Sequence, residues 1–225
     1  MIRTICAAAV AALLCTAATP AQDGKFSIKP EKAAAPTELK PDVAKLLGDE
    51  AVQFLDPKGG VVCTLWFRKE VPADATAEQI KNGITYAELK ETTILGAVKF
   101  EQQWTDYRKQ KIKPGVYTLR LGFQPMDGDH MGASPEKNFC LLVGADQDTN
   151  PATMEPKTLI EKSMKSIGTG HPGVLMLFEN SKPGATPQLV TKLNNHTVLN
   201  FRENVSAAGQ KAAIGIGLTL IGHAE

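Results

Sequence analysis

Apolar and polar residues alternate with a period of two over much of the chain beyond residue 50, and this pattern constrains the fold more than any other feature. In residues 61–68, VVCTLWFR, every second side chain is apolar, as in a strand with one buried face. Residues 139–145 are continuously apolar, which favours a strand covered on both faces. We predict strands at residues 51–55, 61–67, 94–100, 117–123, 139–145, 174–179, 188–193, 197–203 and 212–221.

Turn residues separate these segments and helical signals are few. The sequence Asp-Pro-Lys-Gly-Gly at residues 56–60 predicts a hairpin, and Pro114-Gly115 fits the centre of a type II turn. Thr76 and Gln79 have capping-box spacing before Gly83, and similar signals predict a second helix over residues 158–168.

These elements predict an all-β protein. An antiparallel β-sandwich of nine or ten strands with two or three short helices is the favoured architecture, and a closed β-barrel is the alternative. A doubly wound α/β fold is excluded, because it needs a helix between most strands.

The first 21 residues have the pattern of a secretory signal peptide. Arg3 precedes an apolar run over residues 5–15, and small residues lead to a cleavage site after Ala21. The apolar run is shorter than the roughly 20 residues that span a bilayer. A lipoprotein would use Cys15, but the bulky Leu14 before it disfavours lipidation. We expect an exported protein, periplasmic or extracellular, with no transmembrane segment after cleavage.

Residues 22–41 contain three prolines and no lasting periodicity, which indicates a flexible tether. The alternative is an edge strand that begins near Phe26 and Ile28. Residues 42–225 then form a single sandwich domain, a size at which an apolar core needs no disulfides.

The charge balance narrows the class of partner. Removing residues 1–21 removes only Arg3 among charged side chains, so 25 basic residues become 24 and balance the 24 acidic ones. A nucleic-acid binder usually carries a basic excess, so the expected partner is a protein or a glycan.

Two cysteines remain after signal cleavage, Cys63 and Cys140, both in predicted strands. An exported protein meets an oxidising compartment, where the two residues can form a disulfide. The alternative is two buried free thiols, whose apolar neighbours raise their pKa and make them poor nucleophiles.

A polar loop after residues 117–123 is the candidate metal site. Asp127, Asp129 and His130 lie within four residues, and His171 joins them if its turn lies at the same end of the sandwich. Oxygen ligands favour Ca²⁺, whereas the imidazoles favour Zn²⁺ or another transition metal. Met131 departs from the EF-hand pattern, so a Gly-rich turn stabilised by its Asp side chains is the structural alternative.

A second loop carries Asp146, Asp148 and Asn150 at alternate positions, which also suits Ca²⁺. Pro151 stands where an EF-hand needs Gly, and a solvated loop is the favoured interpretation.

Two aromatic residues in a polar segment, Trp104 and Tyr107, form a candidate binding platform. Exposed rings beside polar groups bind sugars or protein partners, whereas buried rings close one end of a core.

Residues 112–119, IKPGVYTL, and residues 124–132, QPMDGDHMG, resemble a segment of uncharacterised exported bacterial proteins with β-sandwich bodies. The resemblance implies export and fold, and it implies no established activity.

The sequence contains no G-x-S-x-G elbow, no H-E-x-x-H motif, no Walker loop and no G-x-G-x-x-G after a strand. We therefore favour an exported, non-enzymatic β-sandwich that acts as a binding or envelope-associated accessory module. The alternative is a metal-dependent site, structural or hydrolytic, on the loop of residues 127–130.

Overall fold

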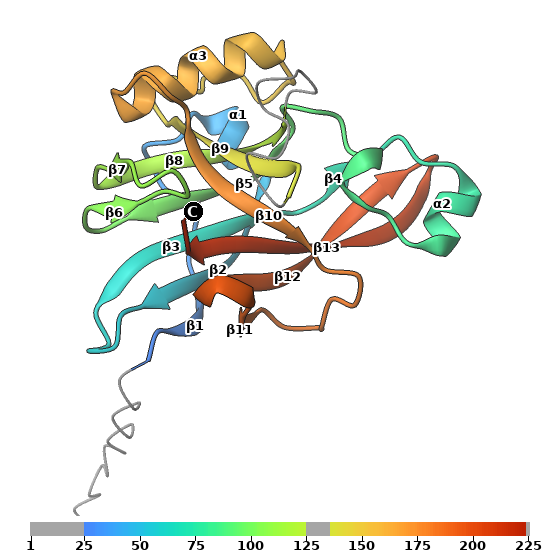
Figure 1. Ribbon diagram of the computed structural model, residues 1–225. Helices are drawn as coiled ribbons and strands as arrows, with labels where there is room; N and C mark the ends of the chain where they lie inside the picture. Colours follow the sequence, from blue (N-terminus) through green and yellow to red (C-terminus); the bar gives the residue numbers. More distant parts are fainter. Residues whose placement is uncertain (1–24, 125–135, 224–225) are drawn as a thin grey trace, which may run out of the picture.

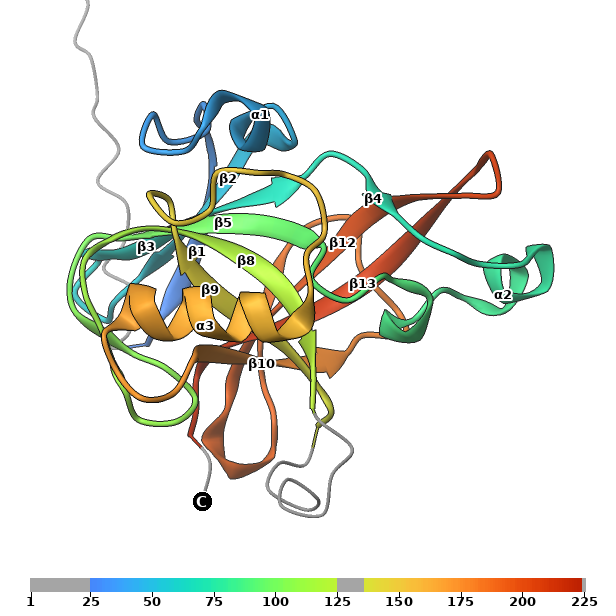
Figure 2. The same ribbon diagram turned by 90° about the horizontal axis from the view of Figure 1, so that it is seen from above.

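One large sheet dominates the molecule. The computed structural model describes residues 25–124 and 136–223, in which eleven strands belong to this sheet. Ten follow the order β1-β2-β3-β5-β8-β9-β10-β13-β12-β11 with every neighbouring pair antiparallel, and β4 pairs with β12 in parallel. Because strands twist, a sheet this wide curls, and here it forms a half-barrel (Figures 1 and 2).

The strands of the large sheet are β1 (Ser27–Lys32), β2 (Leu47–Leu55), β3 (Val61–Arg68), β4 (Val71–Pro72), β5 (Ile94–Phe100), β8 (Gly115–Phe123), β9 (Asn138–Gly144), β10 (Gly173–Glu179), β11 (Gln188–Thr191), β12 (Thr197–Ala207) and β13 (Gln210–Ile221). A separate two-stranded hairpin is formed by β6 (Trp104–Thr105) and β7 (Lys111–Ile112). The helices are α1 (Pro41–Ala44), α2 (Ala77–Asn82) and α3 (Pro156–Ile167), with 3-10 turns η1 (Tyr86–Glu88) and η2 (Leu193–Asn195).

The concave interior of the half-barrel is filled with apolar side chains. They come from alternate positions of the strands, such as Leu119 and Leu121 of β8, in agreement with the period-two pattern. Phe67 of β3 and Phe201 of β12 stack with ring centroids 4.0 Å apart, although several strands separate them along the sheet. The two sides of the curled sheet therefore pack directly on each other.

Both ends of this interior are closed by segments outside the main strands. At one end, the buried Tyr86 of η1 donates its hydroxyl to the Phe178 carbonyl at 2.9 Å and accepts the Gly217 N–H at 3.3 Å. At the other end, Trp104 packs edge-on against Phe26 and Phe54.

A second apolar layer covers the convex face. Residues 33–46, including α1, lie over β2, β3, β5 and β8, where Val43 is buried and the Trp66 indole donates to the Ala33 carbonyl at 3.0 Å. Helix α3 covers β9 through Leu159, which packs with Val143. The protein therefore contains an inner core and a thinner outer one, which lies between the sheet and the helices α1 and α3 that cover it (Figure 2).

Prolines mark the two edges of the half-barrel. Cα atoms of the edge strands β1 and β11 come within 8 Å of each other, but the two strands do not pair. Pro30 lies in β1 and Pro187 directly precedes β11, and a proline has no N–H to donate to a neighbouring strand. A surface pocket of about 380 Å³ lies at this seam. The prolines give a physical reason why the sheet stays open.

The all-β prediction is confirmed, and the finer prediction of a sandwich is not, because one continuous sheet replaces two separate ones. All nine predicted strands are present, although β2, β12 and β13 are longer than expected and β11 is shorter. Thr76 and Gln79 form the predicted capping box of α2. Helix α3 ends at Gly168 as predicted but begins earlier than expected, at Pro156, because proline is favoured in a first turn.

The flexible tether predicted for residues 22–41 needs correction. From Ser27 to Lys32 the chain forms β1, and Leu39 is buried in the outer core, so the alternative of an edge strand is what the structure contains. The prolines permit this, since they fall on an edge and in loops. Among the described residues, no helix is long and apolar enough to cross a membrane.

Candidate functional site

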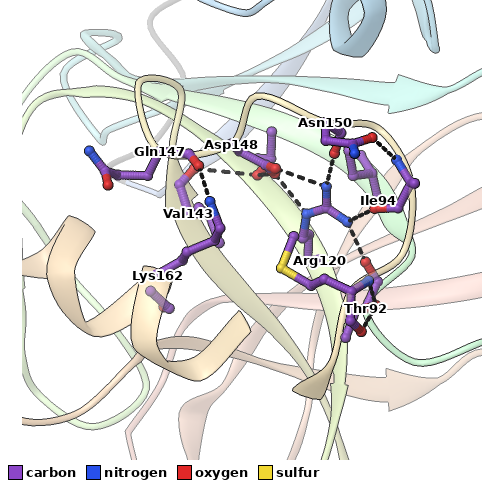
Figure 3. A network of polar contacts seen from close by, with 12 residues as sticks. Thr92, Ile94, Arg120, Val143, Gln147, Asp148, Asn150 and Lys162 are labelled. Carbon is purple, nitrogen blue, oxygen red and sulfur yellow. Dashed lines mark hydrogen bonds and ion pairs between the residues drawn. The ribbon is translucent and has the colours of Figure 1, made fainter. Parts of the chain in front are cut away.

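Arg120 and Asp148 form a buried ion pair on the convex side of β8 (Figure 3). The Arg120 guanidinium donates to both carboxylate oxygens, from Nε to Oδ2 at 2.7 Å and from Nη2 to Oδ1 at 2.8 Å. Both side chains are at most 1% exposed. A bidentate ion pair of this kind is among the stronger polar contacts in proteins, because both hydrogen bonds are charge-assisted.

The remaining guanidinium N–H groups are also used. Nη1 donates to the carbonyls of Thr92 and Ala152 at 2.6 and 3.0 Å, and Nη2 donates to the carbonyl of Asn150 at 2.6 Å. All five donors of the guanidinium are therefore occupied. The network fastens residues 146–154 onto the sheet and leaves no donor of Arg120 for a ligand.

This network changes the interpretation of the second candidate calcium loop. Asp148 directs both oxygens to Arg120, and Asn150 accepts the Ala152 N–H at 2.9 Å through its side-chain oxygen. Asp146 is exposed and accepts a hydrogen bond from Gln147. The three side chains do not converge on a common point. Asp148 instead holds this loop to the sheet through its ion pair with Arg120.

Glu203 is a second buried carboxyl, and it is far less satisfied. It lies on the inward face of β12 at 2% exposure, and one oxygen accepts the Arg68 backbone N–H at 3.2 Å. The other oxygen has no hydrogen-bond partner. Burial raises the pKa of Glu203 well above its usual value, although the Arg68 amide and guanidinium oppose the shift.

The predicted metal ligands Asp127, Asp129 and His130 lie outside the described residues, and the site they would form stays a prediction. The described residues on either side of them follow β8 and precede β9, whereas the exposed His171 precedes β10 at the opposite end of these strands. Strand β9 has seven residues, about 20 Å of strand. The register therefore gives no support to a site that includes His171. In residues 25–124 and 136–223, no three His, Cys, Asp or Glu side chains gather as metal ligands.

Cys63 and Cys140 are both free and buried. Cys63 in β3 and Cys140 in β9 are separated in the sheet by β5 and β8. Of the two alternatives that the sequence allowed, a disulfide or two free thiols, the structure therefore contains the free thiols. Desolvation raises the pKa of both thiols, and the nearby carboxyls of Glu101 and Glu203 add to the effect. Each cysteine is thus an inert part of the core, as its apolar neighbours predict.

The aromatic platform predicted at Trp104 and Tyr107 belongs mainly to the core. Tyr107 is 5% exposed, and Trp104 is half-buried with its indole N–H donating to the Leu220 carbonyl at 2.9 Å. Of the two alternatives, the structure contains the buried ring for Tyr107, whose loop folds back so that its backbone N–H donates to the Val174 carbonyl.

A surface pocket of about 400 Å³ lies at the end of the sheet where β8 begins and β9 ends. Its lining includes Val116 and Tyr117 together with the charged residues Glu38, Lys40 and Asp146. The carboxylates accept hydrogen bonds and the ammonium group donates them, so the pocket suits a polar ligand with hydroxyl groups. Asp146 was singled out by the sequence, whereas Glu38 and Lys40 come from a segment that the sequence predicts as a tether.

Four exposed basic residues next to this pocket escaped the sequence interpretation. The hairpin β6–β7 and the turn that follows it carry Arg108, Lys109, Lys111 and Lys113, a set that we call the basic ridge. The sequence does contain a local basic cluster, RKQKIK at residues 108–113, but the net charge of the whole chain does not reveal it.

We found no match for this chain among protein-family models, curated proteins or solved structures.

Proposed function

We propose that the protein is an exported, non-enzymatic binding module associated with the cell envelope, which holds its ligand on the outside of the half-barrel. The observation that carries this proposal is the filled interior. Apolar side chains occupy the concave side, and Tyr86 and Trp104 close its two ends. A ligand would therefore contact loops and surface pockets rather than enter the sheet.

The state of the buried polar groups supports a binding role over a catalytic one. Arg120 and Asp148 are fully engaged with each other and with backbone carbonyls. Burial raises the pKa of Glu203 and of both thiols and keeps these groups away from solvent. Groups in this state lack the access to a substrate that general bases and nucleophiles need.

Export is tested first. The full chain is produced in a bacterium and the cells are fractionated. We expect the protein in the periplasm or the medium, with a new N-terminus at Gln22. A cytoplasmic product that keeps Met1 would overturn this part of the proposal.

Binding is tested with the processed protein from that preparation. It is mixed with insoluble envelope material from bacteria, with and without prior protease treatment of that material, and sedimented. We expect co-sedimentation that persists in the presence of a chelator. Retention only on untreated material would identify a protein partner, loss with the chelator would favour the metal-dependent alternative, and absence of binding to either preparation would contradict the proposal.

A further inference from the structure

We propose that the basic ridge, Arg108, Lys109, Lys111 and Lys113, together with the adjoining pocket, binds an acidic polysaccharide. The inference rests on the proposed function and names its ligand class. It begins from the geometry of the β6–β7 hairpin, which lies at one end of the half-barrel beside the C-terminal end of α3 (Figures 1 and 2).

The alternation of the hairpin aligns its cations. Ile112 is fully buried in the inner core, and its partner Trp104 packs against the same core. Lys111 and Lys113, on either side of Ile112, therefore face outward, and residues two apart in a strand are about 7 Å apart. Arg108 and Lys109 continue the exposed set at the hairpin tip.

The ridge is held rigid by bonds that do not involve its charges. The buried Asp106 accepts the backbone N–H groups of Arg108 and Gln110 at 2.9 and 2.8 Å through Oδ1. The Gln110 side chain then donates to the Pro172 carbonyl at 2.8 Å. The Tyr117 hydroxyl donates to the Lys113 carbonyl at 3.0 Å and fixes the other end. A rigid surface loses less entropy when a ligand binds.

The four cations are free to bind an anion. Within the part of the chain that the structure describes, none of them forms an ion pair, in contrast to Lys99, which pairs with Glu101. Four positive charges without ion-pair partners lie within six residues of a rigid hairpin and create a local positive field on a chain whose formal net charge is only +1.

The residues around the basic ridge favour one class of polyanion over the others. A lipid surface is usually bound by basic residues with exposed apolar side chains beside them, and single-stranded nucleic acid by exposed aromatic rings. Here Ile112 and Tyr107 are buried, and Trp104 is engaged with the core. Pro114 follows the ridge and lines the pocket that carries Glu38, Lys40 and Asp146. A cation row beside hydrogen-bonding groups fits a ligand with both acid and hydroxyl groups, as an acidic polysaccharide has.

Binding to polygalacturonate, with neutral dextran as the comparison polymer, tests the inference. The test variant is R108Q/K111Q/K113Q, and the matched control is K81Q/K90Q/K211Q, which removes three cations that are also exposed but lie outside the ridge. Equal melting temperatures establish that both variants fold. At low salt we expect at least tenfold weaker binding for the ridge variant, less than a twofold change for the control, and a steep decrease for the natural protein as salt rises.

Three outcomes would overturn the inference. They are equal affinity of the ridge variant and the natural protein, no binding of polygalacturonate at all, or stronger binding to anionic phospholipid vesicles or single-stranded DNA than to the polysaccharide. If one of these three outcomes is observed while the ridge variant still binds envelope material, the inference fails alone and the proposed function stands.

Discussion

Two of the buried carboxyls, Asp148 and Glu203, are almost completely removed from water, but they have very different numbers of hydrogen-bond partners. Asp148 receives two bonds from Arg120 and one from the Thr118 hydroxyl. Glu203 receives one backbone N–H and has an oxygen without a partner. The first carboxyl joins distant loops, whereas the second is a polar defect in the inner core. Buried charge stabilises a fold only where its hydrogen-bonding groups are matched.

The largest effect is expected from removing one member of the ion pair. Asp148→Ala leaves the Arg120 guanidinium buried without its counter-ion, which should lower the free energy of unfolding by about 3–5 kcal/mol. Urea unfolding measures this. The control is Asp49→Ala, whose pair with Lys32 is exposed, with an expected change below about 1 kcal/mol. Equal effects of the two substitutions would contradict the assignment.

Replacing both members should cost less than the sum of the single changes. In Arg120→Met/Asp148→Leu neither charge remains buried, but the carbonyls of Thr92, Asn150 and Ala152 lose their donor. We expect a destabilised double variant with a coupling energy of about 2 kcal/mol or more in a double-mutant cycle with Arg120→Met and Asp148→Leu as the single variants. Strict additivity would show that the pair does not act as a unit.

Glu203 should make stability fall as pH rises. Its pKa is raised in the folded state, so the folded protein holds the proton more tightly than the unfolded chain. The resulting stabilisation is complete below the usual carboxyl pKa of 4.5 and is lost progressively as pH rises toward the raised value. Urea midpoints from pH 4 to 9 should fall more steeply for the natural protein than for Glu203→Gln. Parallel profiles would show that this carboxyl is not buried as described.

The smallest effect concerns a bond that supports the ion pair. Thr118 donates its hydroxyl to Asp148, and the near-isosteric Thr118→Val removes that donor. Because Asp148 keeps both bonds to Arg120, the expected loss is about 1 kcal/mol in urea unfolding. A loss as large as that of Asp148→Ala would mean that the hydroxyl, rather than the guanidinium, secures the carboxylate.

The strands and their turns were predictable because their signals are local. The alternation in residues 61–68 depends only on neighbours two positions apart, and the capping box of α2 lies within four residues. For residues 22–41 the sequence favoured a tether over strand β1, because Pro30 and a short polar sequence are typical of a flexible segment. This segment forms a strand because it pairs with β2, which would otherwise be the edge of the sheet.

The candidate site was predicted less well, for the same reason. Asp146 was singled out by spacing, yet the pocket it lines also needs Lys40, which lies more than one hundred residues away in the sequence. The basic ridge is local in sequence, but only the burial of Ile112 shows that its lysines face one way.

By itself, the sequence determined the all-β class, the positions of most strands and the capping box of α2, because these follow from interactions between near neighbours. Only the tertiary structure decided that one sheet curls on itself instead of splitting into two. It also decided that Asp148 meets Arg120, 28 residues earlier in the chain, instead of a metal ion. Contacts of this kind depend on long-range packing and on which buried polar groups can form hydrogen bonds with each other. They cannot be predicted from a local pattern of residues.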